Sequence, residues 1–221
     1  MNPKQMAAEK AIDEVKDKMI IGLGTGSTAY FAIQKLGEKT QQGLKVKAVA
    51  SSKNTEDLAR KAGIEIIPFS EVAQIDITID GADEIDHKHN LTKGGGGALL
   101  REKILAFNSR RLLIIVDDSK LVDKLGAFPL PVEIVPFAVD LTLQNLQTLN
   151  CKASLRTEGN NLFITDNGNY IADCRFKVID DPESMNTMIH LIPGVVETGL
   201  FAHKMVSQII VGYEDGSVKI F

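Results

Sequence analysis

Helix-like segments alternate with short apolar, β-branched runs along the first half of the chain, and this alternation constrains the fold more than any other feature. Residues 3–17 carry apolar side chains at helical spacing and lead into the apolar run "MIIGLG". The helix-like "STAYFAIQKLGEK" and "SKNTEDLARKAG" are each followed by a strand-like run, and a helix predicted over about 98–108 is followed by "RLLIIVDDSK". The pattern predicts an α/β domain with a mostly parallel sheet and helices on both faces. Ligands of such sheets bind at the carboxyl ends of the strands, where we expect three candidate loops to lie.

The order of predicted helices and strands changes after the proline-rich "FPLPVEIVPF". From there the pattern predicts a strand, a helix over about 138–149, short strands around an Asn-Gly turn signal in "TDNGNY", a helix near 182–190 and a further strand. The order is either βαβββα or βαββαβ, and both predict a small α+β domain. The last residues, "SQIIVGYEDGSVKIF", predict a hairpin that can return to the first sheet.

Charge and apolar content exclude several classes of partner. The 221 residues include 25 basic and 29 acidic side chains, without a long block of like charges, so nucleic acid and anionic membrane surfaces are not expected as partners. The charged N-terminus lacks the apolar core of a signal peptide, and no apolar run reaches the roughly 18 residues of a membrane span. We therefore expect a cytosolic protein. Cys151 and Cys174 lack a CxxC spacing and are expected to be small buried side chains rather than a disulfide.

The first candidate loop is "GLGTGSTA", residues 22–29, at a predicted turn from strand to helix. Glycines and hydroxyl groups at the start of a helix supply backbone N–H donors and a positive helix dipole, which suit a phosphate group. A dinucleotide fingerprint would need glycine where Ser27 stands, and a Walker loop would need a closing Gly-Lys-Ser/Thr, so neither cofactor motif is present. The alternative is a tight turn in which Ser27 or Thr28 only caps the helix.

The second candidate loop is "DGADEID", which follows the strand-like "IDITI". Asp80 and Asp83 are expected to point into the ligand crevice, while Glu84 and Asp86 are expected to face water. Carboxylates held close together repel one another, which favours a group that exchanges protons near neutral pH. The alternatives are a solvated acidic turn and a divalent-metal site that uses the nearby "HKH", although the spacing does not match a calcium loop.

The third candidate loop is "KGGGGALLREK", in which Lys93 precedes four glycines and a predicted helix. Each glycine costs about 0.5–1 kcal/mol relative to alanine, so the run indicates a need for close backbone approach to a ligand. Glu102 lies about one turn into the helix. A carboxylate base near a cation and a row of amide donors is what an enolisation requires. The alternative for Glu102 is an exposed ion-pair partner of its neighbours Arg101 and Lys103.

Seven motifs in the same order resemble those of the type A ribose-5-phosphate isomerases along essentially the whole chain: "GLGTGSTA", "DGADEID", "KGGGGALLREK", "VDDSK", "FPLPVEI", "TDNGN" and "IPGVVETGLF". The resemblance implies interconversion of ribose 5-phosphate and ribulose 5-phosphate in the pentose phosphate pathway, without a metal or an organic cofactor. It implies a Rossmann-like catalytic domain over 1–128 plus 200–221 and an inserted, ferredoxin-like small domain over 129–199. It also implies a homodimer or a dimer of dimers.

The resemblance also implies roles for individual residues. Glu102 is similar to the base that moves a proton between C2 and C1 through a cis-enediolate. Asp80 is similar to the residue that assists ring opening and hydroxyl proton movement. Lys93 is similar to a lysine that stabilises the oxyanion. The motifs place the following residues against the substrate: Lys4, Thr25, Gly26, Ser27, Thr28, Asp80, Gly81, Ala82, Asp83, Lys93, Gly94, Gly95, Gly96 and Lys120.

Two other function classes fit parts of the pattern. A sugar-phosphate sensor would keep the fold and the phosphate loop without chemistry, but such domains usually follow a DNA-binding segment, and here the first predicted helix leads straight into the first strand. A metal-dependent phosphohydrolase would use the "DGADEID" carboxylates as ligands, and chelation of the metal distinguishes it.

Overall fold

The computed structural model describes residues 2–221, and these form two compact units. The first unit contains the chain up to Ala82, Arg101–Lys120 and Lys204–Phe221. The second contains Asp83–Leu100 and Leu121–His203. Within the described residues, no helix has the length and apolar character needed to cross a membrane.

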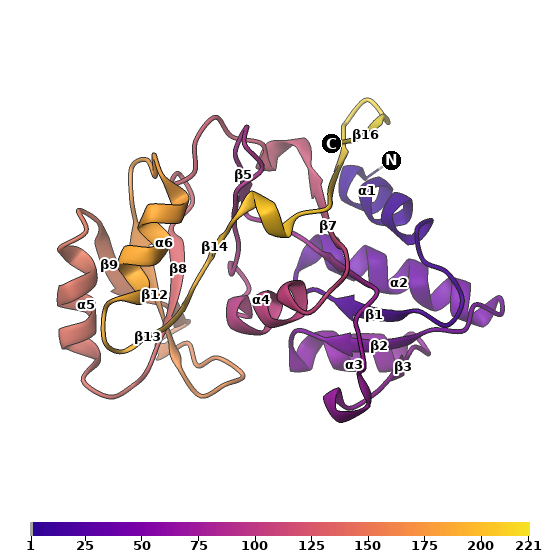
Figure 1. Cartoon of the computed structure of the whole chain (residues 1–221), viewed down its shortest axis with the longest axis horizontal. Helices are drawn as coiled ribbons and strands as arrows, with labels where there is room; N and C mark the ends of the chain where they lie inside the picture. The colour runs from indigo at the N-terminus through magenta and orange to yellow at the C-terminus, as the bar shows by residue number, and fades with distance from the viewer. Residues whose placement is uncertain (1) are drawn as a thin grey trace. The chain divides into compact units, whose positions relative to one another are not determined.

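The first unit is built on a seven-stranded sheet in the order β16-β15-β7-β4-β1-β2-β3 (Figure 1). Every neighbouring pair is parallel except β15 and β16, which form the predicted C-terminal hairpin. The mostly parallel sheet expected from the alternating pattern is therefore confirmed. The strands are β1 (Ile20–Leu23), β2 (Lys47–Ala50), β3 (Glu65–Ile66), β4 (Ile77–Asp80), β7 (Leu112–Asp117), β15 (Gln208–Gly212) and β16 (Val218–Ile220).

Helices cover both faces of this sheet. Helices α1 (Pro3–Ile12), α2 (Ser27–Gln41) and α3 (Lys53–Lys61) pack in one core cluster that includes Ala48, and α4 (Leu99–Phe107) packs through Leu105 in a second cluster that includes Val49. Successive residues of a strand point to opposite faces, so the two clusters lie on opposite sides of the sheet. The short 3₁₀ helices are η1 (Phe69–Glu71), η2 (Asp118–Lys120) and η3 (His203–Met205).

The strand order reverses between β1 and β4. From β1 the chain proceeds to β2 and β3 on one side, whereas β4 is followed in the sheet by β7 and β15 on the other side. Ligands of doubly wound sheets bind outside the carboxyl ends of the strands at this switch point. The loops after β1 and β4 therefore lie where a small ligand is expected.

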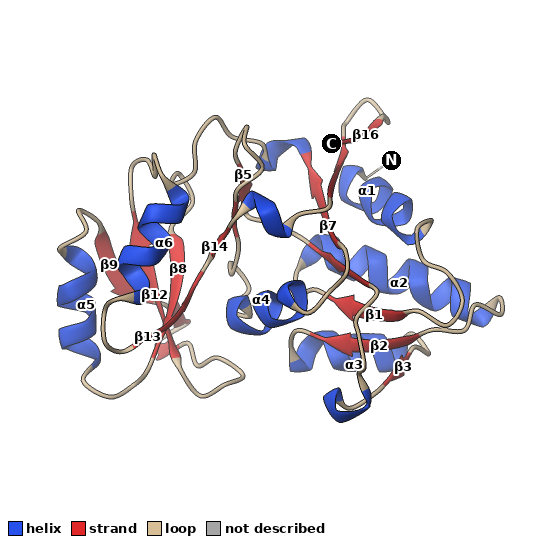
Figure 2. Ribbon diagram, in the orientation of Figure 1, coloured by secondary structure: helices blue, strands red, loops and turns tan. Residues whose placement is uncertain are grey.

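The second unit contains a four-stranded antiparallel sheet in the order β13-β8-β12-β9. The chain order of its main elements is βαββαβ, one of the two orders predicted: β8 (Leu130–Ile134), α5 (Val139–Gln147), β9 (Lys152–Leu155), β12 (Tyr170–Arg175), α6 (Pro182–His190) and β13 (Val195–Thr198). Figure 2 shows both helices beside these strands. Leu146 of α5 and Ile189 of α6 share one core with Val132, Ala172 and Cys174, so both helices cover the same face of the sheet.

The second unit also has a three-stranded sheet in the order β14-β6-β5 and a two-stranded hairpin of β10 and β11. Because β5 and β6 pair with β14 rather than with the seven-stranded sheet, residues 83–100 group with the small unit. This grouping rests on contacts within the chain, and the expected domains of 1–128 plus 200–221 and 129–199 stay a prediction. The strands are β5 (Glu84–Ile85), β6 (Leu91–Thr92), β10 (Thr157–Glu158), β11 (Asn161–Leu162) and β14 (Leu200–Phe201).

Both cysteines are free thiols buried in the core of the second unit, as expected. A hydrogen bond with Cys151 and burial raise the pKa of the Cys174 thiol. This thiol therefore stays protonated and serves as a small apolar side chain.

Candidate active site

The glycine turn after β1 is tied to the neighbouring strands by short polar contacts. The N–H of Gly24 donates to the carbonyl of Ile79 at 2.9 Å, and the carbonyl of Gly24 accepts the hydroxyl of Thr55 at 3.0 Å. The Thr25 hydroxyl lies 2.8 to 3.1 Å from the hydroxyl groups of Ser51, Ser52 and Thr55. These contacts hold the turn in one conformation at the carboxyl end of β1.

Helix α2 begins at this turn with an open N-terminus. Gly26 is the N-cap, has φ of 112° and makes no side-chain cap, so neither Ser27 nor Thr28 caps the helix as the alternative interpretation required. The Ser27 hydroxyl instead accepts from Lys4 Nζ at 3.0 Å, and Lys4 Nζ also lies 3.9 Å from Asp117 Oδ2. A helix N-terminus with a lysine beside it provides donors and positive potential for an anion.

Asp80 ends β4 and lies against the glycine turn. Its side chain is 1% exposed, and its Oδ1 accepts the N–H of Thr25 at 3.2 Å and of Gly81 at 2.8 Å. A Cβ on Gly24 would overlap the Asp80 carboxylate, so the glycine is required for this approach. The structure thus joins two of the predicted loops through one buried carboxylate, and Gly81 and Ala82 continue the second loop.

Glu102 lies in the first turn of α4 and is 3% exposed. The burial is inconsistent with a surface ion-pair partner, the alternative left open by the sequence. A negative charge in the first turn of a helix is favoured by the helix dipole, and a buried carboxylate is suited to a proton-transfer role. Lys120 lies in η2, directly after the carboxyl end of β7, and is partly buried.

The glycine run had been expected at the carboxyl end of a strand of the seven-stranded sheet. It instead follows β6 and belongs to the second unit. Lys93 is 2% exposed, donates its N–H to the carbonyl of Gly199 at 2.8 Å, and holds its ammonium 5.4 Å from the centre of the Phe201 ring. The N–H of Gly95 donates to Asp83 Oδ2 at 2.7 Å. This N–H therefore binds a carboxylate of the protein and is not presented as an oxyanion donor.

Two acids of the second loop have structural partners, which corrects the expectation that they face water. Glu84 is 3% exposed and accepts the N–H groups of Gly126 at 2.9 Å and Phe128 at 2.7 Å. Asp86 is 7% exposed and accepts the N–H groups of Lys88 and Asn90 at 2.8 Å each. Both carboxylates stabilise backbone turns of the second unit.

The two histidines of "HKH", His87 and His89, were candidates for a metal site. His87 Nδ1 lies 2.9 Å from the carbonyl of Asp123, and His89 has φ of 67°. Among residues 2–221, no group of three or more His, Cys, Asp or Glu side chains is placed to hold a metal ion.

The predicted site residues divide between the two units. The first unit holds Lys4, Thr25, Gly26, Ser27, Thr28, Asp80, Gly81, Ala82, Glu102 and Lys120, and the second holds Asp83, Lys93, Gly94, Gly95 and Gly96. Sequence reasoning did not identify the hydroxyl cluster of Ser51, Ser52 and Thr55 that supports Thr25. The available signal was the hydroxyl-rich "SSKNT" directly after the strand that neighbours β1.

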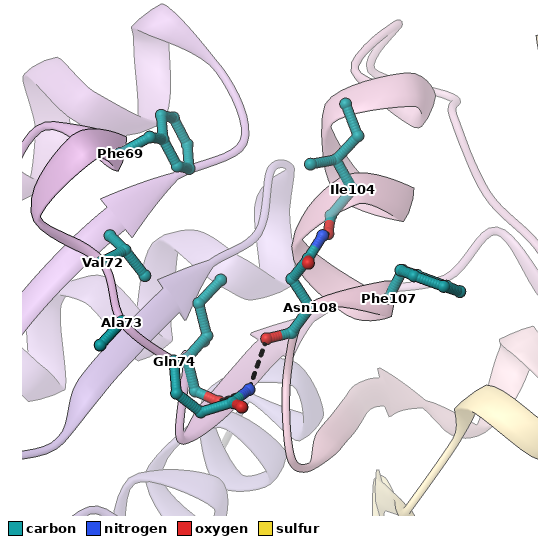
Figure 3. Close-up of a pocket in the computed structure, with 8 residues that line it drawn as sticks. Phe69, Val72, Ala73, Gln74, Ile104, Phe107 and Asn108 are labelled. Carbon is teal, nitrogen blue, oxygen red and sulfur yellow. Dashed lines mark hydrogen bonds between the residues drawn. The ribbon is translucent and has the colours of Figure 1, made fainter.

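A cavity of about 350 Å³ in the first unit lies between η1 and α4, and none of the predicted site residues lines it (Figure 3). Its polar contacts include a 2.8 Å hydrogen bond from Gln74 Nε2 to the carbonyl of Asn108. The side chains that line it include no acid, base or nucleophile, so it offers no chemistry. They are Phe69, Val72, Ala73, Gln74, Ile75, Ile104, Phe107 and Asn108.

A glycine turn at a helix N-terminus after β1 and a buried carboxylate at the end of the adjacent β4 are typical of doubly wound α/β proteins that bind small phosphorylated ligands. A family model described as Ribose 5-phosphate isomerase A (phosphoriboisomerase A) matches residues 47–216. The chain is 52% identical over 217 residues to ribose-5-phosphate isomerase A of Bacillus mycoides, which covers 98% of both sequences. This chain therefore belongs to the ribose 5-phosphate isomerase A family, which confirms the resemblance seen in its motifs.

Solved structures agree with this assignment. A D-ribose-5-phosphate isomerase in complex with phospho-erythronic acid is 40% identical, with a TM-score of 0.94 over 100% of this chain and 99% of that one. Ribose 5-phosphate isomerase A of Methanocaldococcus jannaschii is 40% identical, with a TM-score of 0.92 over 99% of this chain and 97% of that one.

Proposed function

We propose that this protein interconverts D-ribose 5-phosphate and D-ribulose 5-phosphate through a cis-enediolate, in the non-oxidative pentose phosphate pathway. The observation that carries the proposal is the burial of Glu102 in the first turn of α4, in a chain 52% identical to a ribose-5-phosphate isomerase A over 98% of its length. The binding of phospho-erythronic acid, a phosphorylated sugar acid, by a 40% identical relative supports the substrate class.

The substrate phosphate binds at the N-terminus of α2. The N–H groups after Gly26, the hydroxyls of Ser27 and Thr28, and the Lys4 ammonium supply donors and positive charge there. Lys120, after β7, adds a second cation at the same edge of the sheet.

Glu102 removes the proton from C2 of the open-chain aldose, and the electron pair of that bond forms the C1–C2 double bond as the C1 carbonyl oxygen becomes an oxyanion. Return of the proton to C1, with transfer of the O2 proton to O1, yields the ketose without any net oxidant. Asp80 assists ring opening and the hydroxyl proton transfer, Asp83 holds sugar hydroxyls, and the Lys93 ammonium stabilises the oxyanion. Of the glycine amides, Gly94 and Gly96 keep the donor role, because Gly95 donates to Asp83.

The fold proposal is a Rossmann-like catalytic domain with an inserted ferredoxin-like domain over residues 129–199. The strand order β13-β8-β12-β9 and the βαββαβ element order support the second part, since that element order is typical of ferredoxin-like domains.

We also propose a cytoplasmic homodimer or dimer of dimers. The exposed apolar side chains of Phe69, Ile104 and Phe107, the last 80% exposed, support assembly, because soluble monomers rarely expose large apolar clusters. Light scattering should give a mass of twice or four times 24.1 kDa, and a mass of one chain would contradict the assembly.

The function is tested by incubating the purified protein with ribose 5-phosphate in excess EDTA and measuring ribulose 5-phosphate. We expect full activity in the chelator, because the proposed chemistry uses only protein groups. Activity lost to EDTA would indicate the metal-dependent alternative. A folded protein that binds ribose 5-phosphate without converting it would indicate a sensor.

A further inference from the structure

The glycine run has few contacts of its own to hold its shape. Its internal hydrogen bond joins the N–H of Gly97 to the carbonyl of Gly94 at 2.9 Å, and both residues have positive φ, at 77° and 100°. Glycine has the largest backbone freedom of any residue, so a run of four needs external contacts to keep one conformation. In the proposed reaction the N–H of Gly96 must point at the substrate.

Arg156 supplies such contacts. It lies between β9 and β10, where its N–H donates to the carbonyl of Ile171 at 2.8 Å. Its Nη1 donates to the carbonyl oxygens of Gly94 and Gly95, both at 2.9 Å. One guanidinium group therefore holds two consecutive peptide planes of the glycine run.

Asp173 fixes the guanidinium group in turn. Arg156 Nε donates to Asp173 Oδ2 at 3.0 Å and Nη2 donates to Oδ1 at 2.5 Å, which makes a two-point contact between side chains 14% and 20% exposed. Asp173 lies between Ala172 and Cys174 on β12, and because those neighbours face the helices, Asp173 faces the opposite side of the sheet.

Phe163 completes the support. The Arg156 guanidinium carbon is 5.8 Å from the centre of the Phe163 ring, and a Cβ on Gly97 would overlap the same ring. The ring thus packs against both the arginine and the end of the glycine run. Asp173, the Phe163 ring and the carbonyl of Ile171 therefore hold Arg156 beside the glycines.

The peptide group is planar, so fixing a carbonyl oxygen also fixes the N–H of the next residue. The carbonyls of Gly94 and Gly95 share their peptide planes with the N–H groups of Gly95 and Gly96. The first of these N–H groups donates to Asp83. A cation at the carbonyl end also polarises the peptide group, which strengthens its N–H as a donor.

We propose that Arg156, oriented by Asp173, is a positioning residue that holds the Gly94 and Gly95 carbonyls so that the N–H of Gly96 is directed at the substrate oxyanion. This inference rests on the proposed isomerase function. Arg156 acts through the glycine backbone and contacts no reacting atom.

The test compares Arg156→Met with Arg156→Lys, which keeps the charge but not the two-pronged geometry. Loss of Arg156 alone leaves the Asp173 carboxylate without its cation, so the double variant Arg156→Met/Asp173→Asn is measured as well. The matched control is Arg175→Met, an exposed arginine two residues from Asp173 on β12. Hydrogen exchange of a peptide covering residues 93–98 is measured without substrate, together with kcat and KM.

We expect faster exchange in residues 93–98 and a kcat about 10²-fold lower for Arg156→Met and the double variant, with KM within about threefold of wild type. Arg156→Lys should recover part of kcat, and Arg175→Met should match wild type. Unchanged exchange in residues 93–98 would overturn the proposal. Faster exchange with unchanged kcat, or a loss confined to KM, would overturn the positioning role. An inactive wild type would overturn the proposed function instead. The exchange measurement would still show whether Arg156 holds the glycine run.

Discussion

Replacing Glu102 with glutamine should lower kcat for ribose 5-phosphate by about 10²–10⁴-fold, the usual contribution of a general base. The amide has nearly the same shape as the carboxylate but cannot accept the proton from C2. The stability loss should be small, about 0.3–1 kcal/mol, because the variant loses a favourable charge in the first turn of α4. Steady-state kinetics and thermal unfolding of the same preparation measure both effects.

Glu133→Gln is the matched control for this experiment. Glu133 is also a fully buried carboxylate, and its Oε1 accepts from Thr165, Asn167 and Asn169 at 2.9 to 3.0 Å. A glutamine oxygen can accept the same three hydrogen bonds. Activity per folded molecule should stay within about twofold of wild type. If both variants lost activity equally, or if Glu102→Gln kept wild-type kcat, Glu102 would not be the base.

Replacing Gly24 with alanine should lower kcat/KM by about 10²-fold, the effect of displacing a catalytic group by about 1 Å. The new methyl group would overlap the Asp80 carboxylate and push it away from the N–H groups of Thr25 and Gly81. Overpacking of this kind costs about 1–3 kcal/mol of stability. For a chain of this length, each kcal/mol shifts the melting temperature by about 2–4 °C.

Gly22→Ala separates the effect on the site from the effect on packing. Gly22 lies two residues earlier on β1, opposite Thr78 of β4, and a Cβ there would overlap the Thr78 hydroxyl. That hydroxyl bonds to Ser109 at 2.6 Å and has no role in the proposed chemistry. The two variants should lose similar stability, but only Gly24→Ala should lose most of its activity per folded molecule. Equal activities would show that the position of Asp80 does not matter.

Local pattern in the sequence was sufficient to predict the mostly parallel sheet and to select the loops that carry the proposed site. The alternation of helical and β-branched periods predicted the parallel sheet, and the glycine and hydroxyl run at 22–29 predicted an anion-binding turn, because both signals depend on residues close together in the chain. The motif series identified the family, and the helix predicted over about 98–108 corresponds to α4. Glu102 was recognised as a candidate base, but its burial was not predictable from a run of alternating charges.

The tertiary structure decided which of several similar groups are available for chemistry. "DGADEID" contains four acids, and the sequence did not reveal their partners: Glu84 and Asp86 bind backbone N–H groups of their own unit, and Asp80 lies against the turn after β1. The two backbone N–H groups that Glu84 binds are more than 40 residues away in the chain, so no local pattern could reveal them.

The same reason explains two further features that depend on contacts between distant segments. Residues 83–100 group with the small unit because β6 pairs with β14, more than 100 residues later. Arg156 reaches the glycine carbonyls across about 60 residues of chain. Periodicity and turn chemistry act over a few residues and therefore determine elements and loops. Strand pairing and side-chain contacts between distant segments decide which loop carries which function, and these depend on how the whole chain packs.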